Sequence, residues 1–425
     1  MSRRFEAPKG TFDQLPPASG SRAEVERIML EQARLAGYQP IETPIFEDTA
    51  VFARGVGEAT DVVQKEMYTF TDKGGRSLTL RPELTAGIVR ALIEHGRLTT
   101  GLTKVVCSGP QFRYERPQAG RQRQFSQVDI EAMGSNDPAI DADVILVGHE
   151  VFRRLEIPVT LLLTSLGDPV CRPAYRDALL GFLHRLGDQL PAEARARAEQ
   201  NPLRVLDMKD PRVQALTADA PLMRDFLCNA CKAHDQAVQE LLAGAGVEWA
   251  EAPRLVRGLD YYVRTTFEWQ AKSLDAAQNA LGGGGRYDGL SEALGGPQAP
   301  GIGWALGLDR TTLALQQAGR LPPDPWRLDA LVLPLVPAAK VPAQVLVRDL
   351  RRAGLVADLP YAERTLNGHM KAAAKAAART VVILGEQELA AGLAAVRDMT
   401  ARDQQAVPLE EVVARVRQVA AGGTP

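Results

Sequence analysis

The spacing of hydrophobic residues along the chain predicts three blocks of secondary structure. From residue 1 to about 165, helical spacing in segments such as SRAEVERIMLEQARLAG alternates with strand patterns such as LTKVVCS and QVDIEAM. From about 166 to 250 the pattern is helical and rich in alanine and leucine, and strand signals resume between 256 and 281. This order predicts a helical insertion within one sheet-containing domain.

A proline-rich segment, LPPDPW at 321–326, precedes the third block and is typical of a linker. Beyond it, LDALVLPLV, AQVLVRDLRRAG, TVVILG and LEEVVARVRQVA predict strand, helix, strand and helix, with strands apolar enough to be buried on both faces. We therefore predict two domains. The first covers residues 1–325 with the insertion at about 166–250, and the second covers residues 326–425 as a small α/β domain.

The segment FSQVDIEAM at 125–133 separates polar from apolar side chains by strict alternation. Gln127, Asp129 and Glu131 share one face of the predicted strand, and the other face is apolar. A half-exposed strand with a solvated polar face would show the same pattern. The preceding segment, GPQFRYERPQAGRQRQ, favours a binding site, because its arginines would lie beside this row of acceptors. Guanidinium groups suit phosphate oxygens, and carboxylates suit the nitrogen donors of a substrate.

Three further segments carry candidate chemistry. LTLRPELTAGIVRALIEHG at 78–96 predicts a strand that leads into a helix, with Thr85 as the N-cap. Glu83 at this junction is also explained by a favourable interaction with the helix dipole. The glycine-rich segments LGGGGRYDGL and PGIGWALGLDR lack the spacing of Walker A and dinucleotide-binding loops. Four consecutive glycines are also compatible with a simple turn between strands.

The composition limits the class of protein. A chain of 425 residues with 45% hydrophobic and 24% charged residues is typical of a globular protein with more than one core. The sequence has no apolar run of about 18 residues and no apolar stretch near MSRRFEAPKG, so we expect no membrane segment and a cytoplasmic location. The four cysteines are too scattered for a disulfide framework. A net charge of −2 disfavours a general polyanion binder but allows a local basic stripe.

Several of these segments resemble the motifs of one enzyme family. LAGYQPIETPIFED at 35–48, FRYERPQAGRQRQFSQVDIE at 112–131 and GIGWALGLDR at 301–310 resemble motifs 1, 2 and 3 of class II aminoacyl-tRNA synthetases. RGLDYY at 257–262 and GGGGRYDGL at 282–290 resemble the signature peptides of the histidyl-tRNA synthetase family. The resemblance covers essentially the whole chain. It implies an α+β fold, with a class II antiparallel-sheet catalytic domain that carries a helical insertion, and a C-terminal α/β anticodon-binding domain.

The resemblance implies a histidine–tRNA ligase. Such an enzyme activates histidine with ATP and Mg²⁺ to histidyl-adenylate and transfers the histidyl group to the 3′ end of tRNA(His). Arg257 would bridge the attacking carboxylate and the α-phosphate, where negative charge accumulates. A general base is unnecessary because the carboxylate is already ionised. Arg257 and Tyr262 alternate to opposite faces of a regular strand, so their joint action in one pocket requires a bend, for which Gly258 is the expected place.

The family's other roles carry over to matching positions of this sequence. The implied catalytic residues are Arg257 and Arg113. The implied histidine-binding residues are Glu83, Thr85 and Gln127 near the ammonium group and backbone, Glu131 and Tyr262 at the imidazole, and Tyr261 and Tyr287 as walls. The implied ATP-binding residues are Arg113 at the α-phosphate, Glu115 at the adenine, and Arg121 and Arg310 at the outer phosphates. Asp129 receives no role.

The resemblance also implies contacts with tRNA. Motif 1 implies a homodimer, Arg116 and Gln118 would lie near the extra guanosine at the 5′ end of tRNA(His), and the C-terminal domain would read the GUG anticodon. In RTLNGHMKAAAKAAAR at 364–379, Lys371, Lys375 and Arg379 recur every four residues and predict a basic stripe on a helix. A solvated helix face explains this stripe equally well.

The segment CNACKAH resembles half of a zinc site. On a helix, however, the three-residue steps between Cys228, Cys231 and His234 rotate these side chains away from one another. Tetrahedral closure would also need a fourth ligand that the sequence does not indicate. We therefore predict no metal site.

Two other functions remain to be weighed. A catalytically inactive paralogue of the family acts as the regulatory subunit of ATP phosphoribosyltransferase, but it typically lacks the signature arginine and the anticodon domain, whereas this chain has both. Synthetases for threonine, proline or glycine share the architecture. They are not expected to combine an acidic imidazole reader with RGLDYY.

Overall fold

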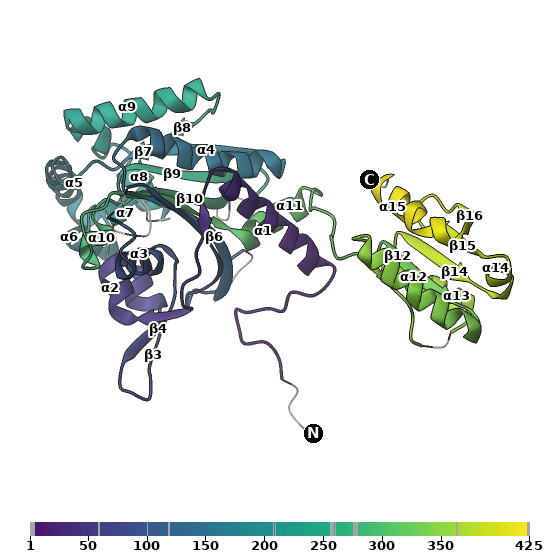
Figure 1. Cartoon of the computed structure of the whole chain (residues 1–425). Helices are drawn as coiled ribbons and strands as arrows, with labels where there is room; N and C mark the ends of the chain where they lie inside the picture. The colour runs from purple at the N-terminus through teal and green to yellow at the C-terminus, as the bar shows by residue number, and fades with distance from the viewer. Residues whose placement is uncertain are drawn as a thin grey trace. The chain divides into compact units, whose positions relative to one another are not determined.

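An eight-stranded sheet runs through the first of two structural units, which covers residues 1–14 and 22–322 (Figure 1). This computed structural model describes residues 5–57, 60–99, 101–117, 120–206, 208, 210–255, 259, 261–274, 279–362 and 364–422. The strand order is β1-β5-β6-β11-β10-β9-β7-β8. The bounds are β1 (Gln39–Pro40), β5 (Thr103–Phe112), β6 (Gln124–Met133), β7 (Val159–Ser165), β8 (Ala250–Glu251), β9 (Val263–Ala271), β10 (Ala280–Arg286) and β11 (Gly301–Gly307).

The pairing of the strands is antiparallel from β5 through to β7, and only the short edge strands β1 and β8 pair in parallel. In β6, Val128, Ile130 and Ala132 point into the main core, as the alternation predicts. That core also contains Trp269 of β9 and Trp304 of β11. The sheet therefore offers one apolar face to helices and leaves the other face of β6 free for polar residues.

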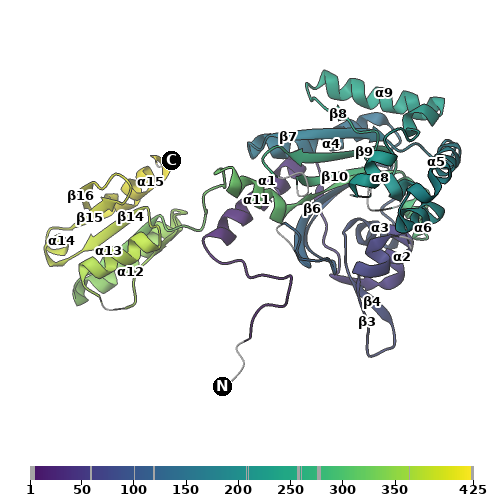
Figure 2. The same ribbon diagram turned by 180° about the vertical axis from the view of Figure 1, so that it is seen from behind.

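Helices cover the sheet on both sides, as Figures 1 and 2 show from opposite directions. On the side of the main core lie α1 (Ala18–Leu35), α4 (Pro138–Arg154), α9 (Asn229–Gly244) and α11 (Leu308–Gln317). On the other side lie α2 (Thr49–Val56), α3 (Thr85–Glu94), α10 (Leu290–Ala293) and a three-stranded sheet of order β2-β4-β3. Its strands are β2 (Phe46–Asp48), β3 (Tyr68–Thr71) and β4 (Ser77–Leu80), and the π-helical turn η1 (Val62–Glu66) precedes β3.

The predicted helical insertion is present between β7 and β8. It consists of α5 (Arg172–Leu186), η2 (Gly187–Gln189), α6 (Ala192–Gln200), α7 (Leu203–Leu206), α8 (Pro211–Leu216), η3 (Met223–Phe226) and the long helix α9. These elements have a core of their own, which includes Tyr175, Leu179 and Val205. The insertion thus has a core of its own, and its last helix α9 also packs against the main core through Val238 and Leu242.

The second unit, residues 15–21 and 323–425, contains a five-stranded sheet of order β13-β12-β14-β15-β16. The strands are β12 (Ala330–Pro334), β13 (Ala357–Asp358), β14 (Thr380–Leu384), β15 (Leu393–Asp398) and β16 (Gln404–Pro408). The helical segments are η4 (Pro337–Ala339), α12 (Lys340–Arg352), α13 (Leu366–Lys375), α14 (Glu386–Ala390), η5 (Leu409–Glu411) and α15 (Val412–Gly422). Two hydrophobic clusters, one with residues of α12 and α15 and one with residues of α13, pack on the sheet.

The expected fold class is confirmed, with a correction at the glycine-rich segment. Gly282 to Gly285 do not form a turn but lie inside β10, between β9 and β11. A Cβ atom at Gly285 would lie 2.7 Å from the carbonyl oxygen of Thr265, so the neighbouring backbone leaves no room for a side chain there. The antiparallel strands β15 and β16 were not predicted. The functional division at 325/326 stays a prediction, although the structural units divide at 322/323.

Candidate active site

A cavity of about 570 Å³ opens on the polar face of the large sheet. It is lined by residues of β6, β9, β10, β11 and the start of α3, which are far apart in the sequence. Every predicted histidine-binding and ATP-binding residue lines this cavity: Glu83, Thr85, Arg113, Glu115, Arg121, Gln127, Glu131, Tyr261, Tyr262, Tyr287 and Arg310. Arg257 and Gln118 lie outside the described residues, as does Gly258. The fold therefore gathers in one place the residues that the motifs single out.

Glu131 lies at the buried end of the cavity and is only 1% exposed. Thr85 donates its hydroxyl hydrogen to Oε1 of Glu131 across 2.6 Å, and the phenol of Tyr287 donates to Oε2. Gly303 of β11 pairs directly with Glu131, and a Cβ atom at this position would collide with the carboxylate. The carboxylate is thus held in a fixed position, and each oxygen keeps a lone pair for another donor.

Glu83 closes the start of α3. Its carboxylate accepts hydrogen bonds from the backbone nitrogens of Thr85, at 2.8 Å, and Ala86, at 3.0 Å. The helix begins at Thr85 itself, so the expected role of Thr85 as the N-cap is wrong. The Thr85 side chain turns to Glu131, and the Glu83 side chain satisfies the free N–H groups of the first turn.

Burial perturbs the acids of this end of the cavity. It raises the pKa of Glu131 to about 8, and this rise is opposed by the hydrogen bonds from Thr85 and Tyr287. Burial, followed by the neighbouring carboxylates of Glu131 and Glu83, raises the pKa of Asp129 well above its usual range. Burial also raises the pKa of Glu83. Three buried acids this close together favour a bound cation, whose charge would stabilise their ionised forms.

Three tyrosines form an aromatic wall beside Glu131. The ring centroids of Tyr261 and Tyr262 are 4.7 Å apart, and those of Tyr261 and Tyr287 are 5.7 Å apart with an edge-to-face arrangement. Burial raises the pKa of Tyr261 and of Tyr287 well above the usual range for a phenol, so both keep their hydroxyl hydrogens. The wall can therefore enclose a small planar ring.

The other end of the cavity is rich in guanidinium groups. Arg310 donates to the carbonyl oxygens of Gly120, at 2.8 Å, and Ala280, at 2.9 Å. Arg121 pairs with Glu115 at 3.1 Å, and Arg113 donates to the carbonyl of Pro82 at 2.8 Å. Burial lowers the pKa of Arg310, and the like charge of Arg121 adds to this effect. Clustered cations of this kind suit a polyphosphate.

Some cavity residues were missed by sequence reasoning. Glu268 and Gln270 of β9 line the cavity, and so does Asp309, which pairs with Arg22 at 3.0 Å. The alternation of Phe267, Glu268, Trp269 and Gln270 carries the same polar-face signal as β6. It could have indicated Glu268 and Gln270.

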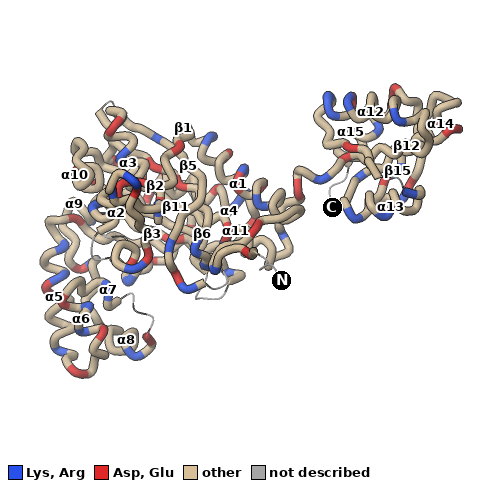
Figure 3. The backbone as a smooth tube through the Cα atoms, turned by 90° about the horizontal axis from the view of Figure 1, so that it is seen from below, with Lys and Arg blue, Asp and Glu red and all other residues tan. Residues whose placement is uncertain are grey.

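The remaining predicted contacts lie outside the cavity. Arg116 is exposed in the loop after β5, and Lys371 and Lys375 are exposed on α13, whose basic residues are blue in Figure 3. Arg379 does not extend this stripe. The helix ends at Lys375, Ala377 has a left-handed backbone with φ of 50°, and Arg379 turns to the carbonyl of Ala420 at 2.6 Å.

The cysteine segment also differs from the expected helical rotation. Cys228 precedes α9 and only Cys231 lies in its first turn, so the two side chains are not separated by helical rotation. His234 does not share a site with these cysteines, because its Nε2 atom forms a hydrogen bond with Asp141 Oδ2 at 2.8 Å. Asp141 in turn pairs with the fully buried Arg286, which also bonds to Asp288 at 3.0 Å.

Comparisons with known proteins agree with this geometry. The family model described as histidyl-tRNA synthetase matches residues 10–311, and the model described as anticodon binding domain matches residues 329–419. An antiparallel catalytic sheet followed by an anticodon-binding domain defines the chain as a class II aminoacyl-tRNA synthetase. Among the described residues, the helices are all too short or too polar to cross a membrane.

Curated relatives identify the family more closely. A histidine–tRNA ligase of Nocardia farcinica is 54% identical over 415 residues, which is 97% of this chain and 98% of the relative. A histidine–tRNA ligase of Mycobacterium tuberculosis is 51% identical over 420 residues, covering 98% and 99% of the two chains. The crystal structure of apo histidyl-tRNA synthetase from S. aureus superposes with a TM-score of 0.80 and 34% identity, over 97% of this chain and all of that one. The chain belongs to the histidyl-tRNA synthetase family, and like these curated histidine–tRNA ligases it is an aminoacyl-tRNA ligase.

Proposed function

We propose that the cavity binds histidine at its acidic end and ATP at its arginine-rich end, forms histidyl-adenylate, and passes the histidyl group to the 3′ end of tRNA(His). The main support for this proposal is that one cavity has an acidic end and an arginine-rich end. Glu131 is held by Thr85 and Tyr287 at one end, and Arg121 and Arg310 gather at the other. We place the reaction in the cytoplasm, where tRNA is charged.

The acidic end suits the two nitrogen-bearing groups of histidine. The free lone pairs of Glu131 would accept a hydrogen bond from an imidazole N–H, and Tyr262 would bond the second ring nitrogen. Gln127 Oε1 is buried and has no hydrogen-bond partner among the described residues, so it is available to the α-ammonium group. Glu83 and Thr85 would share that group, and Tyr261 and Tyr287 would enclose the ring.

The arginine-rich end suits ATP. Arg113 would contact the α-phosphate, Arg121 and Arg310 the outer phosphates, and the carboxylate of Glu115 the amino edge of the adenine. An oxygen of the histidine carboxylate attacks the α-phosphorus, the bond to the bridging oxygen breaks, and pyrophosphate leaves with that electron pair. Arg257, which lies outside the described residues, is assigned the bridge between carboxylate and phosphate. These guanidinium groups stabilise the negative charge that develops in the transition state.

Magnesium fits the same end of the cavity. Mg²⁺ binds through substrate phosphates and one or two carboxylates, and Glu268 presents a carboxylate on the wall that Arg310 also lines. When bound, the ion neutralises phosphate charge. Glu268 would help to hold it there.

Contacts with tRNA are assigned to both units. Arg116 and Gln118 would lie near the extra 5′ guanosine of tRNA(His), and the second unit would bind the anticodon arm. Lys371 and Lys375 are exposed one helical turn apart on α13, as a contact with backbone phosphates requires.

A homodimer is proposed from the motif 1 region. Ile45 and Phe46 are exposed there, at 45% and 52%, and the ring of Phe46 packs edge-to-face against the equally exposed Phe70. A second copy would cover these apolar side chains. Sedimentation at micromolar concentration should show a dimer. Phe46→Asp should dissociate it, and Leu366→Asp, at an exposed apolar residue of the second unit, should not; a wild-type monomer would contradict the assignment.

A regulatory subunit without catalytic activity is the second candidate. It is disfavoured because Arg113, Arg121 and Arg310 line the cavity with the acidic pocket complete. A synthetase for proline or glycine is disfavoured because those side chains offer no hydrogen-bond donor to the buried Glu131. One for threonine is disfavoured because the wall of three tyrosines suits a planar ring better than a small branched side chain.

Charging of tRNA tests the proposal. The protein should esterify labelled histidine to a tRNA(His) transcript, and Arg113→Gln should abolish the reaction. Arg153→Gln, the same change at an exposed arginine of α4, should leave it intact. A wild-type protein that binds histidine and ATP but forms no histidyl-tRNA would favour the regulatory function.

A further inference from the structure

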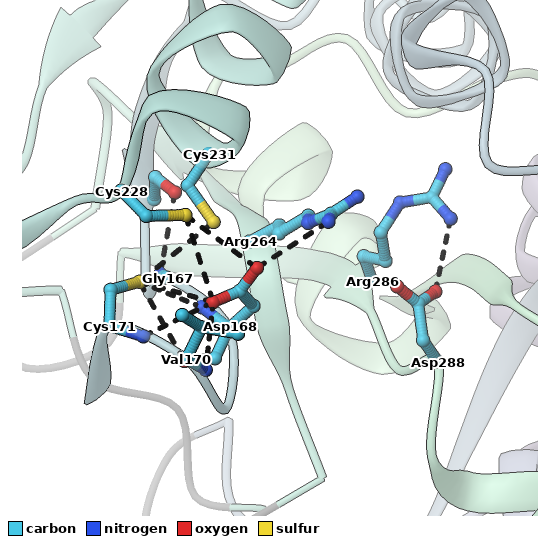
Figure 4. A network of polar contacts seen from close by, with 10 residues as sticks. Gly167, Asp168, Val170, Cys171, Cys228, Cys231, Arg264, Arg286 and Asp288 are labelled. Atoms are coloured by element: carbon cyan, nitrogen blue, oxygen red, sulfur yellow. Dashed lines mark hydrogen bonds and ion pairs between the residues drawn. The ribbon is translucent and has the colours of Figure 1, made fainter. Parts of the chain in front are cut away.

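The start of the helical insertion and the start of its last helix, α9, meet at one cluster of sulfur and oxygen atoms. Asp168 and Cys171 lie in the turn between β7 and α5, and Cys228 and Cys231 lie at the start of α9. Figure 4 shows the side chains of these residues pointing toward one another from the two segments. The cluster joins positions 60 residues apart in the chain.

The distances within this cluster match the edges of a small tetrahedron. One ligand atom from each of the four residues can be chosen so that all lie within 4.8 Å of one another. Cys171 Sγ is 3.9 Å from Cys231 Sγ, and Asp168 Oδ1 is 3.3 Å from Cys171 Sγ and 4.0 Å from Cys228 Sγ. Around zinc, bond lengths of about 2.3 Å to sulfur and 2.1 Å to oxygen give edges of about 3.8 Å between sulfurs and about 3.6 Å between sulfur and oxygen.

The surroundings of the cluster are those of a closed structural site. Asp168, Cys171 and Cys231 are buried, and Cys228 is partly buried. Gly167 has φ of 63°, and a Cβ atom there would lie 2.7 Å from Cys171 Sγ, so the turn can approach the sulfurs only with glycine. The carbonyl oxygen of Gly167 accepts a hydrogen bond of 2.7 Å from the backbone N–H of Arg264, which connects the turn to β9.

Arg264 supplies an outer contact. Its guanidinium lies 3.5 Å from Asp168 Oδ2, also drawn in Figure 4, and its backbone has a left-handed φ of 48°. A zinc ion with three thiolates and one carboxylate carries a net charge of −2, which a neighbouring guanidinium offsets. Contacts from neighbouring side chains to the metal-binding residues orient these residues around the metal.

We propose that Asp168, Cys171, Cys228 and Cys231 bind a structural zinc ion that joins the turn at the start of the helical insertion to the start of its last helix, α9. Four protein ligands leave no open position, so the ion has no part in the chemistry of the active site. Binding displaces the protons of the three thiols, and no oxidation takes place. The proposal is independent of the reaction assigned to the cavity.

The competing structures are a hydrogen-bonded thiol cluster and a disulfide between Cys171 and Cys231. The first needs no metal, and the second consumes two of the four ligands. Metal content separates them. The full-length protein, incubated with Zn²⁺ and a reductant and then dialysed, should retain about one zinc ion per chain.

Cobalt substitution reports the ligands directly. The protein loaded with Co²⁺ should show sulfur-to-cobalt charge-transfer bands and the intense d–d bands of a tetrahedral site, and added Zn²⁺ should bleach them. Cys228→Ser and Cys171→Ser should lose the metal, whereas Cys107→Ser, at a buried free cysteine of β5, should keep it. Asp168→Cys should also keep it, because a fourth thiolate completes the same tetrahedron.

Arg264→Gln tests the outer contact. It keeps all four ligands and should weaken zinc affinity about 10- to 100-fold, measured by competition with a chromophoric chelator. Removal of the metal from the wild type should lower the melting temperature and expose the insertion to protease.

Several outcomes would overturn the proposal. They are wild-type protein that retains no zinc after loading, a cobalt spectrum without thiolate bands, and zinc retained equally by the Cys171 and Cys228 variants. Detection of a Cys171–Cys231 disulfide in metal-free native protein would also overturn it. If the serine variants fail to fold, the wild-type cobalt spectrum and Asp168→Cys still decide the question.

Discussion

The replacement of Glu131 by glutamine removes an ionisable carboxyl group from the buried end of the cavity and changes little else. Glutamine has nearly the same shape, and its side-chain oxygen can still accept one of the two hydrogen bonds from Thr85 and Tyr287. The change should separate two consequences of the buried carboxylate. One is the affinity of the site for histidine. The other is the loss of stability in the substrate-free protein when the buried carboxylate ionises.

The effect on histidine follows from the loss of a charged acceptor. A hydrogen bond to a charged group contributes about 1.5 to 3 kcal/mol, so the KM for histidine should rise about 10- to 150-fold. The KM for ATP should change much less, because the arginine-rich end of the cavity is untouched.

The effect on stability follows from the pKa of Glu131, which burial raises from 4.5 to about 8. A raised carboxyl pKa means that the folded protein binds the proton more tightly than the unfolded chain does. The contribution of this proton to the free energy of unfolding is complete below pH 4.5 and is lost as the pH rises through 8. Multiplied by 2.303RT, about 1.4 kcal/mol, the difference between the two pKa values corresponds to about 5 kcal/mol at full ionisation. Glu131→Gln cannot ionise, so its stability relative to wild type should increase over this pH range.

The assay combines steady-state kinetics with thermal unfolding of the substrate-free protein between pH 5 and pH 9. Relative to wild type, the melting temperature of Glu131→Gln should be similar at pH 5 and higher at pH 9. Glu150→Gln, the same change on the exposed face of α4, should alter neither the KM for histidine nor the pH profile. An unchanged KM for histidine, or a difference in melting temperature that does not grow with pH, would refute the reasoning.

Three other variants have defined outcomes. Arg257→Ala should fold normally and lose about 10²- to 10³-fold in adenylate formation, measured by pyrophosphate exchange; near wild-type exchange would exclude the assigned role. Gly303→Ala should impair histidine binding at least as much as Glu131→Gln and should also lower stability, because its methyl group would collide with the Glu131 carboxylate and with the carbonyl oxygen of Ile130. A crystal structure with Glu131 unmoved would exclude this cause. The pair Lys371→Glu and Lys375→Glu should weaken tRNA binding and flatten its dependence on salt, and a wild-type salt slope would mark the stripe as ordinary surface.

The acidic end of the site was predictable because it lies on one regular strand. In β6 the alternation of side chains fixes which residues face the cavity, so Gln127, Asp129 and Glu131 could be grouped from the sequence. The arginines could be added only through the resemblance to known motifs. Spacing does not determine where a loop such as 113–123 folds back.

The sequence left open whether the glycine-rich segment is a turn or a strand, and the reason is physical. Glycine has no side chain, so Gly282 to Gly285 carry no alternation that could indicate a strand. Their reason for being glycine lies in neighbours that the sequence does not reveal. The backbone of β11 lies close to Gly282 and Gly284, and Thr265 lies close to Gly285.

The cysteine cluster shows the same limit at longer range. The spacing of Cys228 and Cys231 indicates half of a metal site, but only the fold brings Asp168 and Cys171 to it. The basic stripe on α13 was cut short by one backbone feature, the left-handed Ala377, which turns Arg379 away from the helix axis. Alanine gives no sign of such a conformation in the sequence.

The central claim is that one cavity joins histidine to ATP, and pyrophosphate exchange tests it most directly. Purified protein should be incubated with ATP, Mg²⁺ and labelled pyrophosphate, with each amino acid supplied in turn and without tRNA. The account predicts that label enters ATP with histidine and with no other amino acid, and that Arg113→Gln abolishes the exchange. Exchange supported by another amino acid, or its absence with histidine, would contradict the account.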